Sequence, residues 1–212
     1  MENKTENASK TINAGEKKPA AVTLVPLEES DREQFVKDNQ RAFKYGATEE
    51  FGMRDDHFEE DDEIISARTI ERSIDGKFAE AYRIVLDEKK VGGVVISVEP
   101  GTGRGDLELL FVCPEEHSRG IGYAAWCAVE KMHPEVEIWE TMTPYFEKRN
   151  IHFYVNRCGF HIVEFFNEFH PEPDDPEEPD GPDDGEDPGG DDGMFRFEKI
   201  ILAVKKIDGA IK

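Results

Sequence analysis

The chain has 212 residues, of which 37% are hydrophobic and 35% charged, and its formal net charge at pH 7 is −22. This length favours a single domain, and a negative surface is repelled by phosphodiester backbones and anionic lipids, so we expect neither nucleic-acid nor membrane binding. No apolar run approaches the roughly 20 residues that cross a bilayer, and residues 1–20 lack a secretory signal, which together predict a cytoplasmic protein.

Two segments have a composition that cannot form a hydrophobic core. Residues 1–20 are mostly polar, and we expect a disordered tail there. Residues 171–193 (PEPDDPEEPDGPDDGEDPGGDDG) contain twelve Asp or Glu and no Lys or Arg, and their prolines, glycines and mutual repulsion predict a disordered acidic loop. The rest of the sequence predicts one domain over 21–212, into which this acidic loop is inserted.

The first predicted elements are one strand followed by two helices. Residues 21–27 (AVTLVPL) are rich in β-forming residues. Ser30 and Glu33 have the spacing of a capping box, which predicts a helix that runs through Tyr45. Apolar residues recur at helical spacing over 62–75, which predicts a second helix.

The next part of the chain predicts three strands and a buried helix. Residues 79–86, 91–98 and 106–112 are strand-like and are joined by short turns, as in an antiparallel meander. Apolar side chains then recur every three or four residues over 121–132. This spacing predicts a helix that buries one side and ends before Pro134.

The last predicted elements are three strands and one helix. Residues 135–141 and 161–169 predict strands, with a helix over 148–158 between them. Residues 195–204 alternate and predict a seventh strand, which would pair with 161–169 across the acidic loop. Because helices and strands alternate only in part, the predicted fold class is α+β, with a central, mostly antiparallel mixed sheet of about seven strands and flanking helices.

Residues 106–123 (DLELLFVCPEEHSRGIGY) carry the strongest chemical signal in the sequence. A strand that ends near Pro114 is followed by a loop and by residues 118–122 (SRGIG) at the start of a helix. Unpaired N–H groups at a helix N-terminus bind phosphate, and glycines let the phosphate approach the backbone. The alternative is a tight turn that binds nothing. Neither GxGxxG after the first strand nor GxxxxGK[ST] occurs, which argues against dinucleotide and P-loop sites.

Two motifs in this order resemble those of the GCN5-related N-acetyltransferases (GNAT), which bind acetyl-coenzyme A. The first is V-x-P followed by (Q/R)-x-x-G-x-(G/A), matched by residues 112–122 (VCPEEHSRGIG), with His117 in place of Gln or Arg. The second is an Asn, a Tyr one turn later and a Gly-Phe pair, matched by Asn150, Tyr154 and 159–160, with Tyr five residues before Gly rather than four. The resemblance covers about 21–169 and 194–205. It implies a sheet that splays after its fourth strand, so that acetyl-CoA enters between strands four and five.

The resemblance also implies which residues bind acetyl-CoA, the acetyl donor. The backbone of 111–113 would hold the pantetheine arm, and the loop 117–122 would hold the pyrophosphate. Asn150 would contact the pantetheine arm or, alternatively, cap its helix. The predicted cofactor-binding residues are Phe111, Val112, Cys113, His117, Ser118, Arg119, Gly120, Ile121, Gly122 and Asn150.

Acetyl transfer to an amine needs a base for the amine proton and a proton donor for the departing sulfur. Because side chains alternate along a strand, Asp106 and Glu108 are expected to share a face with Leu110 and Val112. Glu108 is the first choice of base and Asp106 the second, the alternative being edge carboxylates that face solvent. Tyr154 resembles the family's proton donor, the alternative being a core tyrosine beneath the sheet.

The predicted function is direct acetyl transfer from acetyl-CoA to a primary amine of a cationic small molecule or peptide, without a covalent enzyme intermediate. An acidic cluster over 55–63 would suit a cationic acceptor, or would be an ordinary solvated surface. The alternative function is a catalytically weak acetyl-CoA-binding module whose acidic loop binds a basic partner protein. We expect a monomer or a homodimer.

No metal site is expected. The six histidines include no HExxH pair, and residues 171–193 do not match the spacing of a calcium-binding loop. The three cysteines are too few and too scattered for a disulfide framework or a Cys-rich zinc site, and they are predicted to be reduced, structural thiols.

Overall fold

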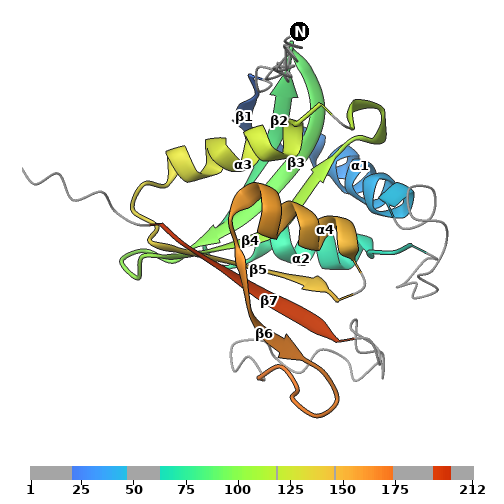
Figure 1. Ribbon diagram of the computed structural model, residues 1–212. Helices are drawn as coiled ribbons and strands as arrows, with labels where there is room; N and C mark the ends of the chain where they lie inside the picture. The colour runs from blue at the N-terminus through green and yellow to red at the C-terminus, as the bar shows by residue number, and fades with distance from the viewer. Residues whose placement is uncertain (1–20, 47–62, 118, 146, 174–192, 202–212) are drawn as a thin grey trace, which may run out of the picture.

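The computed structural model describes residues 21–46, 63–117, 119–145, 147–173 and 193–201. These residues form a seven-stranded sheet with the order β1-β2-β3-β4-β5-β7-β6, flanked by helices (Figure 1). The strands are β1 (Thr23–Pro26), β2 (Ala79–Leu86), β3 (Lys89–Val98), β4 (Arg104–Val112), β5 (Ile138–Pro144), β6 (His161–Phe166) and β7 (Met194–Ile200). The helical segments are η1 (Glu29–Asp31), α1 (Arg32–Tyr45), α2 (Ala67–Asp75), η4 (Pro114–Glu116), α3 (Ile121–Met132), α4 (Lys148–His152) and η5 (Phe153–Cys158).

The start of α1 differs from the prediction. Ser30 lies inside the 3₁₀ turn η1, so the predicted capping box with Glu33 does not form, and the N-cap of α1 is Asp31. The Asp31 carboxylate makes no capping bond, because it accepts hydrogen bonds from the buried Arg83 of β2, from Nε at 2.7 Å and from Nη2 at 3.1 Å. This carboxylate therefore ties the first turn of α1 to the sheet.

The second helix is shorter than predicted. It begins at Ala67, because the Ser66 hydroxyl caps it by accepting a hydrogen bond from the Thr69 amide at 3.0 Å. Residues 63–66 precede the helix, and residue 62 lies outside the described residues.

The sheet consists of two antiparallel parts joined by one parallel pair. Strands β1 to β4 form the predicted antiparallel meander, and β5, β7 and β6 form the second antiparallel part. The predicted pairing of the last two strands across the acidic loop is confirmed by the β6–β7 pairs. The α+β class and the mostly antiparallel mixed sheet of seven strands are likewise confirmed.

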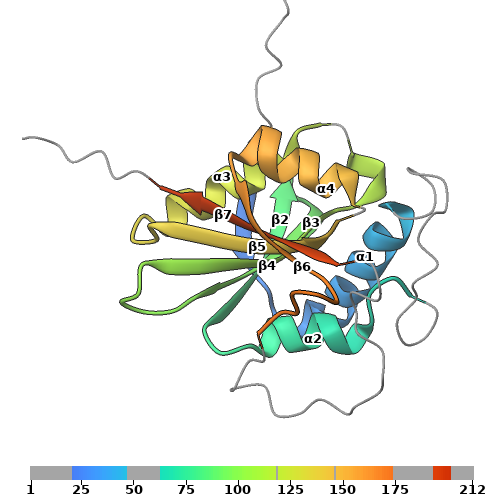
Figure 2. The same ribbon diagram turned by 60° about the horizontal axis from the view of Figure 1, so that its bottom comes forward.

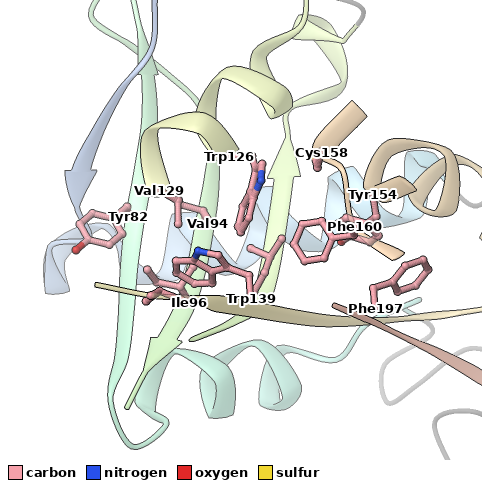
Figure 3. Close-up of a cluster of buried hydrophobic side chains, with 12 residues drawn as sticks. Tyr82, Val94, Ile96, Trp126, Val129, Trp139, Tyr154, Cys158, Phe160 and Phe197 are labelled. Carbon is pink, nitrogen blue, oxygen red and sulfur yellow. The ribbon is translucent and has the colours of Figure 1, made fainter. Parts of the chain in front are cut away.

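Helices cover both faces of the sheet and create two separate cores. α1 and α2 pack on one face, and α3 with η5 packs on the other (Figures 1 and 2). The core beneath α3 is built around Trp126, Trp139, Phe160 and Phe197, which are fully buried (Figure 3). No helix within the described ranges is long and apolar enough to span a bilayer.

Candidate active site

The sheet opens between β4 and β5, in its middle. These strands are paired only through Arg104–Asp106 and Ile138–Glu140. One residue further along, the Thr141 hydroxyl of β5 donates to the Leu107 carbonyl of β4 at 2.9 Å. Beyond this bond, β4 continues to Val112 without a registered partner in β5, so the predicted separation of the fourth and fifth strands is present in the structure.

The backbone of β4 directs some of its hydrogen-bonding groups toward this open edge. The Cys113 amide donates to the Val91 carbonyl of β3 at 2.8 Å, and the Cys113 carbonyl accepts from the Glu116 amide at 2.9 Å. Both backbone groups of Cys113 thus have a partner within the protein, and its role on the pantetheine arm stays a prediction. Because backbone groups alternate in direction along a strand, Phe111 also points to β3, whereas Val112 and Leu110 point to the opening. Sequence reasoning missed Leu110, since the register decides which amides face the opening.

The side chain of His117 links the loop that follows β4 to the surrounding elements. Its Nε2 donates to the Val112 carbonyl at 2.9 Å, and its Nδ1 accepts from Nη2 of Arg149 at 3.5 Å. The imidazole ring also packs against Tyr45 of α1, with ring centroids 5.4 Å apart. The His117 side chain therefore holds β4, α1 and α4 around the loop, and its backbone amide donates to the Pro114 carbonyl at 3.3 Å.

The N-terminus of α3 presents unpaired backbone donors. Gly120 is the N-cap with φ of +74°, and no side chain among the described residues caps the helix. The first intrahelical bond runs from the Ala124 amide to the Gly120 carbonyl at 3.0 Å, which leaves the amides of the first turn for a ligand. Ile121 is buried in the core, so only its backbone is available, and a Cβ at Gly120 would meet no atom within 4 Å.

Arg119 lies beside this helix start and is exposed. Its guanidinium pairs with the Glu116 carboxylate, and exposed pairs of this kind are weak enough to be exchanged for a ligand phosphate. Ser118, the other predicted member of this loop, lies outside the described residues.

A β-bulge in β4 changes the predicted arrangement of the carboxylates. In the β3–β4 register, Val95 is paired with Leu109 and Ile96 with Leu107, so Glu108 is an extra residue that the register skips. Leu107 therefore packs into the core beneath α3, whereas Leu109 packs into the core beneath α1. The bulge reverses the alternation of side chains along the second half of the strand.

The predicted common face of Asp106, Glu108, Leu110 and Val112 is therefore wrong. Leu110 and Val112 pack beside α3, on the same face as Leu107. Asp106 immediately precedes Leu107 and points to the opposite face, the one that carries α1 and α2. Asp106 and the groups beside the cofactor-binding loop thus lie on different sides of the same strand.

Both candidate bases can be reached from solvent. Asp106 and Glu108 are exposed, although β4 is an internal strand rather than a sheet edge. The protein atoms around Asp106 raise the pKa of its carboxyl by desolvation, and the nearby Arg104 opposes part of this effect.

Tyr154 lies in a π-helical turn, η5, and this explains its unusual spacing. A π-turn holds one more residue than an α-turn, which accounts for the five residues from Tyr154 to Gly159. Gly159 ends the turn with φ of +81°, and the Phe160 amide donates to the Tyr154 carbonyl at 2.9 Å. The extra residue is absorbed inside the helix, so the turn still ends at the Gly-Phe pair.

The Tyr154 side chain is buried among aromatic rings. The ring centroids of Phe153, Phe160 and Phe197 lie 5.6, 5.7 and 5.5 Å from that of Tyr154. Figure 3 shows Phe160 and Phe197 beside Tyr154. Burial raises the pKa of the hydroxyl to about 12, and a hydrogen bond with Thr141 opposes this increase. The hydroxyl therefore keeps its proton at neutral pH, as a proton donor must.

Asn150 is inside α4 and is not its cap. The N-cap of α4 is Glu147, which excludes the alternative role predicted for Asn150. The Asn150 amide donates from Nδ2 to Oγ1 of the buried Thr143 at 3.3 Å, which fixes α4 to the inner face of β5.

The acidic segments lie mostly outside the described residues. Of the cluster over 55–63, the structure describes Glu63, which pairs with Lys44 of α1 at 3.2 Å. Of the acidic loop, residues 171–173 and 193 are described. Among the described residues, no group of three or more His, Cys, Asp or Glu side chains is arranged to hold a metal ion.

Comparison with known proteins identifies close and distant relatives. The chain is 44% identical over 180 residues to YrkN of Bacillus subtilis (strain 168), which bears the description uncharacterized protein; the match covers 85% of this chain and 94% of YrkN. The ribosomal-protein-S18-alanine N-acetyltransferase of Escherichia coli has a similar structure, with a TM-score of 0.55, 15% identity and coverage of 88% of this chain and 99% of that one. The PaiA N-acetyltransferase of Thermoplasma acidophilum, solved with coenzyme A, gives a TM-score of 0.55 at 14% identity, covering 85% of this chain and 99% of that one.

These structural similarities, at low identity, concern the fold. The family itself is established by the sequence, because the model of the acetyltransferase (GNAT) family matches residues 34–160, more than half of the chain. This range contains β4, the loop with His117, the start of α3 and the π-turn with Tyr154. The chain therefore belongs to the GNAT family of acetyltransferases.

Proposed function

We propose that this protein transfers the acetyl group of acetyl-CoA directly to a primary amine of a cationic small molecule or peptide. Family membership makes acetyl-CoA the co-substrate. One observation carries the proposal: the opening between β4 and β5 lies beside the uncapped start of α3. Backbone donors along the opening suit the amide groups of a pantetheine arm, and the amides of the α3 N-terminus suit a pyrophosphate.

The residues around the opening supply the roles that acetyl transfer needs. The amides of Val112 and Leu110 hold the pantetheine arm, assisted by Asn150, and Gly120 and Gly122 leave the α3 amides accessible to phosphate oxygens. A lysine-like amine must lose its proton before it attacks, which costs about 4–5 kcal/mol at pH 7. A carboxylate that takes this proton lowers the cost.

The chemical step forms one bond and breaks another. The amine nitrogen attacks the thioester carbon, its proton passes to Glu108, with Asp106 as the second choice, and the C–S bond breaks. Tyr154 then protonates the departing sulfur. The placement of Asp106 on the face opposite α3 supports this division, because the acceptor reaches the thioester from one side of β4 while the coenzyme lies along the α3 side.

The first experiment is a calorimetric titration of acetyl-CoA into the protein, followed by a screen of primary amines (polyamines, aminoglycosides and basic peptides) with detection of the released thiol. We expect micromolar binding and turnover of at least one cationic amine. Tight binding of acetyl-CoA without turnover of any amine would favour the alternative, a binding module, and absence of binding would reject the proposal.

Variants of the two carboxylates test the choice of base. Glu108→Gln is expected to lower kcat by roughly 10²-fold or more, the usual contribution of a general base, with the deficit shrinking as pH approaches the pKa of the amine. Asp106→Asn is the matched control, because it removes the neighbouring carboxylate, and it should lower kcat much less. A pH–rate profile of Glu108→Gln parallel to that of the wild type would reject Glu108 as base.

A further inference from the structure

Two adjacent residues of α4 contact the two sides of the opening between β4 and β5. Asn150 donates from Nδ2 to Oγ1 of Thr143 in β5 at 3.3 Å. Arg149 donates from Nη2 to Nδ1 of His117, in the loop that follows β4, at 3.5 Å. Both contacts are partly buried. Because Asn150 ties α4 to β5, the guanidinium of Arg149 is held on the side of the opening that carries the loop.

The imidazole ring of His117 determines how this guanidinium lies. Its Nε2 donates to the Val112 carbonyl at 2.9 Å, so Nδ1 of the neutral ring presents a lone pair and accepts from Arg149. Val112 is the last residue of β4. The guanidinium is therefore separated by one imidazole ring from the end of the strand along which the pantetheine arm is proposed to lie. In acetyl-CoA the pyrophosphate directly follows this arm.

The contact between Arg149 and His117 is weak enough to be exchanged for a ligand. A separation of 3.5 Å between the two nitrogen atoms is at the outer limit of a hydrogen bond, and the acceptor is a neutral ring. Phosphate oxygens are charged acceptors, and the planar guanidinium can donate to two of them at once. A pyrophosphate beside the loop is thus a stronger partner for this guanidinium than the imidazole ring is.

The two arginines beside the loop differ in the contacts that they make. Arg119 forms an ion pair with the Glu116 carboxylate, which a phosphate has to displace or share. The contact of Arg149 with His117 involves no carboxylate and therefore cancels none of the guanidinium charge. In a chain with a net charge of −22, a positive charge at this position favours an anionic ligand locally.

We propose that Arg149 binds the pyrophosphate of acetyl-CoA together with the amides at the start of α3. The inference rests on the proposed function and extends it, because it assigns to the phosphates a side chain outside the loop 117–122. The His117 ring positions the guanidinium in the absence of the coenzyme, and the guanidinium turns to the phosphate oxygens when the coenzyme binds.

Calorimetric titrations with two coenzymes test this assignment. The proteins are the wild type, Arg149→Gln and Lys148→Gln, the matched control that removes the same charge from the neighbouring, exposed residue of α4. The probes are CoA and 3′-dephospho-CoA, which keeps the pyrophosphate and lacks the 3′-phosphate. We expect Arg149→Gln to raise the Kd of both probes by the same factor, roughly tenfold or more, the scale of a hydrogen bond to a charged group. Lys148→Gln should raise either Kd by less than about twofold.

Salt dependence and kinetics separate phosphate binding from a structural role. The loss in Arg149→Gln should shrink between about 0.05 M and about 0.5 M salt, because screening weakens the interaction that the substitution removes. With the amine of highest kcat/KM from the screen, KM for acetyl-CoA should rise while kcat changes by less than about threefold. Arg149→Lys keeps the charge without the planar fork and should have an intermediate Kd. It replaces Arg149→Gln if melting curves show that this variant is unfolded.

The outcomes distinguish this inference from the proposed function. Equal Kd values for the wild type and Arg149→Gln would overturn the role of Arg149 and leave the proposed function intact. A loss with CoA that is absent with 3′-dephospho-CoA would move Arg149 to the 3′-phosphate, and an equal loss in Lys148→Gln would reduce its effect to the net charge of α4; either result rejects the assignment. Failure of the wild type to bind CoA would reject the proposed function itself.

Discussion

Asp106 is a residue whose surroundings oppose its charge. Desolvation raises the pKa of its carboxyl above the ordinary value of 3.8, so the folded protein holds this proton more tightly than the unfolded chain does. Between 3.8 and the raised pKa the folded state binds more protons, and stability is therefore lost as pH rises through this window. The ionised carboxylate of Asp106 therefore lowers the stability of the folded protein, although it provides a group that can accept a proton.

Asp106→Asn tests this cost directly. The variant should melt at a higher temperature than the wild type at pH 7, and the difference should shrink as pH falls towards 4, because the wild-type carboxyl then becomes neutral as well. Thermal unfolding at several pH values measures the difference, and Glu137→Gln, at an exposed carboxylate, serves as the control. An equal or lower melting temperature for Asp106→Asn at pH 7 would contradict a net desolvation of Asp106.

At the scale of elements, Gly120 and Gly122 at the start of α3 are expected to have different roles. Gly120 has φ of +74°, a conformation that costs an alanine roughly 1–2 kcal/mol, whereas Gly122 is in the helix, where alanine is favoured. A Cβ at Gly122 would lie 3.5 Å from the ring of Phe153, an ordinary contact. We therefore expect the first glycine to be needed for the backbone turn and the second for access of a phosphate to the amides.

Alanine substitutions at the two glycines distinguish the role in the turn from the role in acetyl-CoA binding. Gly120→Ala should lower the free energy of unfolding by roughly 1–2 kcal/mol and also weaken acetyl-CoA binding, because the turn that aims the amides is strained. Gly122→Ala should leave stability unchanged or slightly higher and still raise KM for acetyl-CoA. Chemical denaturation and initial-rate kinetics measure the two quantities, and parallel effects of both substitutions on stability would refute the distinction.

Two elements show why the sequence predicted the fold better than the site. Periodicity places the strands and helices correctly because it reports which side is buried, as for the residues over 121–132 and 79–86. The differences between the predicted and the observed site come from two one-residue insertions. The bulge at Glu108 reverses the strand faces, and the π-turn adds one residue between Tyr154 and Gly159. An insertion of this kind is defined by the partner strand or by the helix that absorbs it, and neither is visible in a local pattern.

At the scale of the whole molecule, a protein with a net charge of −22 has to bind acetyl-CoA, which is itself a polyanion. Half of this charge belongs to residues 174–192, which contain eleven Asp or Glu and no Lys or Arg. At physiological ionic strength the Debye length is about 8 Å, so charges farther than this from α3 hardly oppose a phosphate there, and we expect local amides and Arg119 to decide its binding.

Replacing residues 174–192 by a flexible Gly-Ser linker of about ten residues tests this balance. The replacement spares Gly193, whose φ is +73° and whose carbonyl accepts a hydrogen bond from the Tyr145 amide at 3.2 Å. At about 0.15 M salt the Kd for acetyl-CoA should change less than twofold, and at about 0.01 M, where the Debye length is near 30 Å, the shortened protein should bind more tightly. A marked gain at 0.15 M would place the acidic loop beside the coenzyme.

The small number of residue pairs between β4 and β5 also affects how long the protein lasts in the cell before it is degraded. Three residue pairs, the Thr141 hydroxyl, the Arg104–Glu140 ion pair and two bonds to the Gly103 carbonyl join β4 and the loop before it to β5 and the residue before it. A bound molecule that bridges the two half-sheets adds its own binding energy to the folded state. At 100 times its Kd, such a ligand contributes about 2.7 kcal/mol to the free energy of unfolding. Since cellular proteases degrade chains that open, acetyl-CoA would protect the enzyme that consumes it. The cellular abundance of the protein would therefore follow the supply of its donor without any change in gene expression.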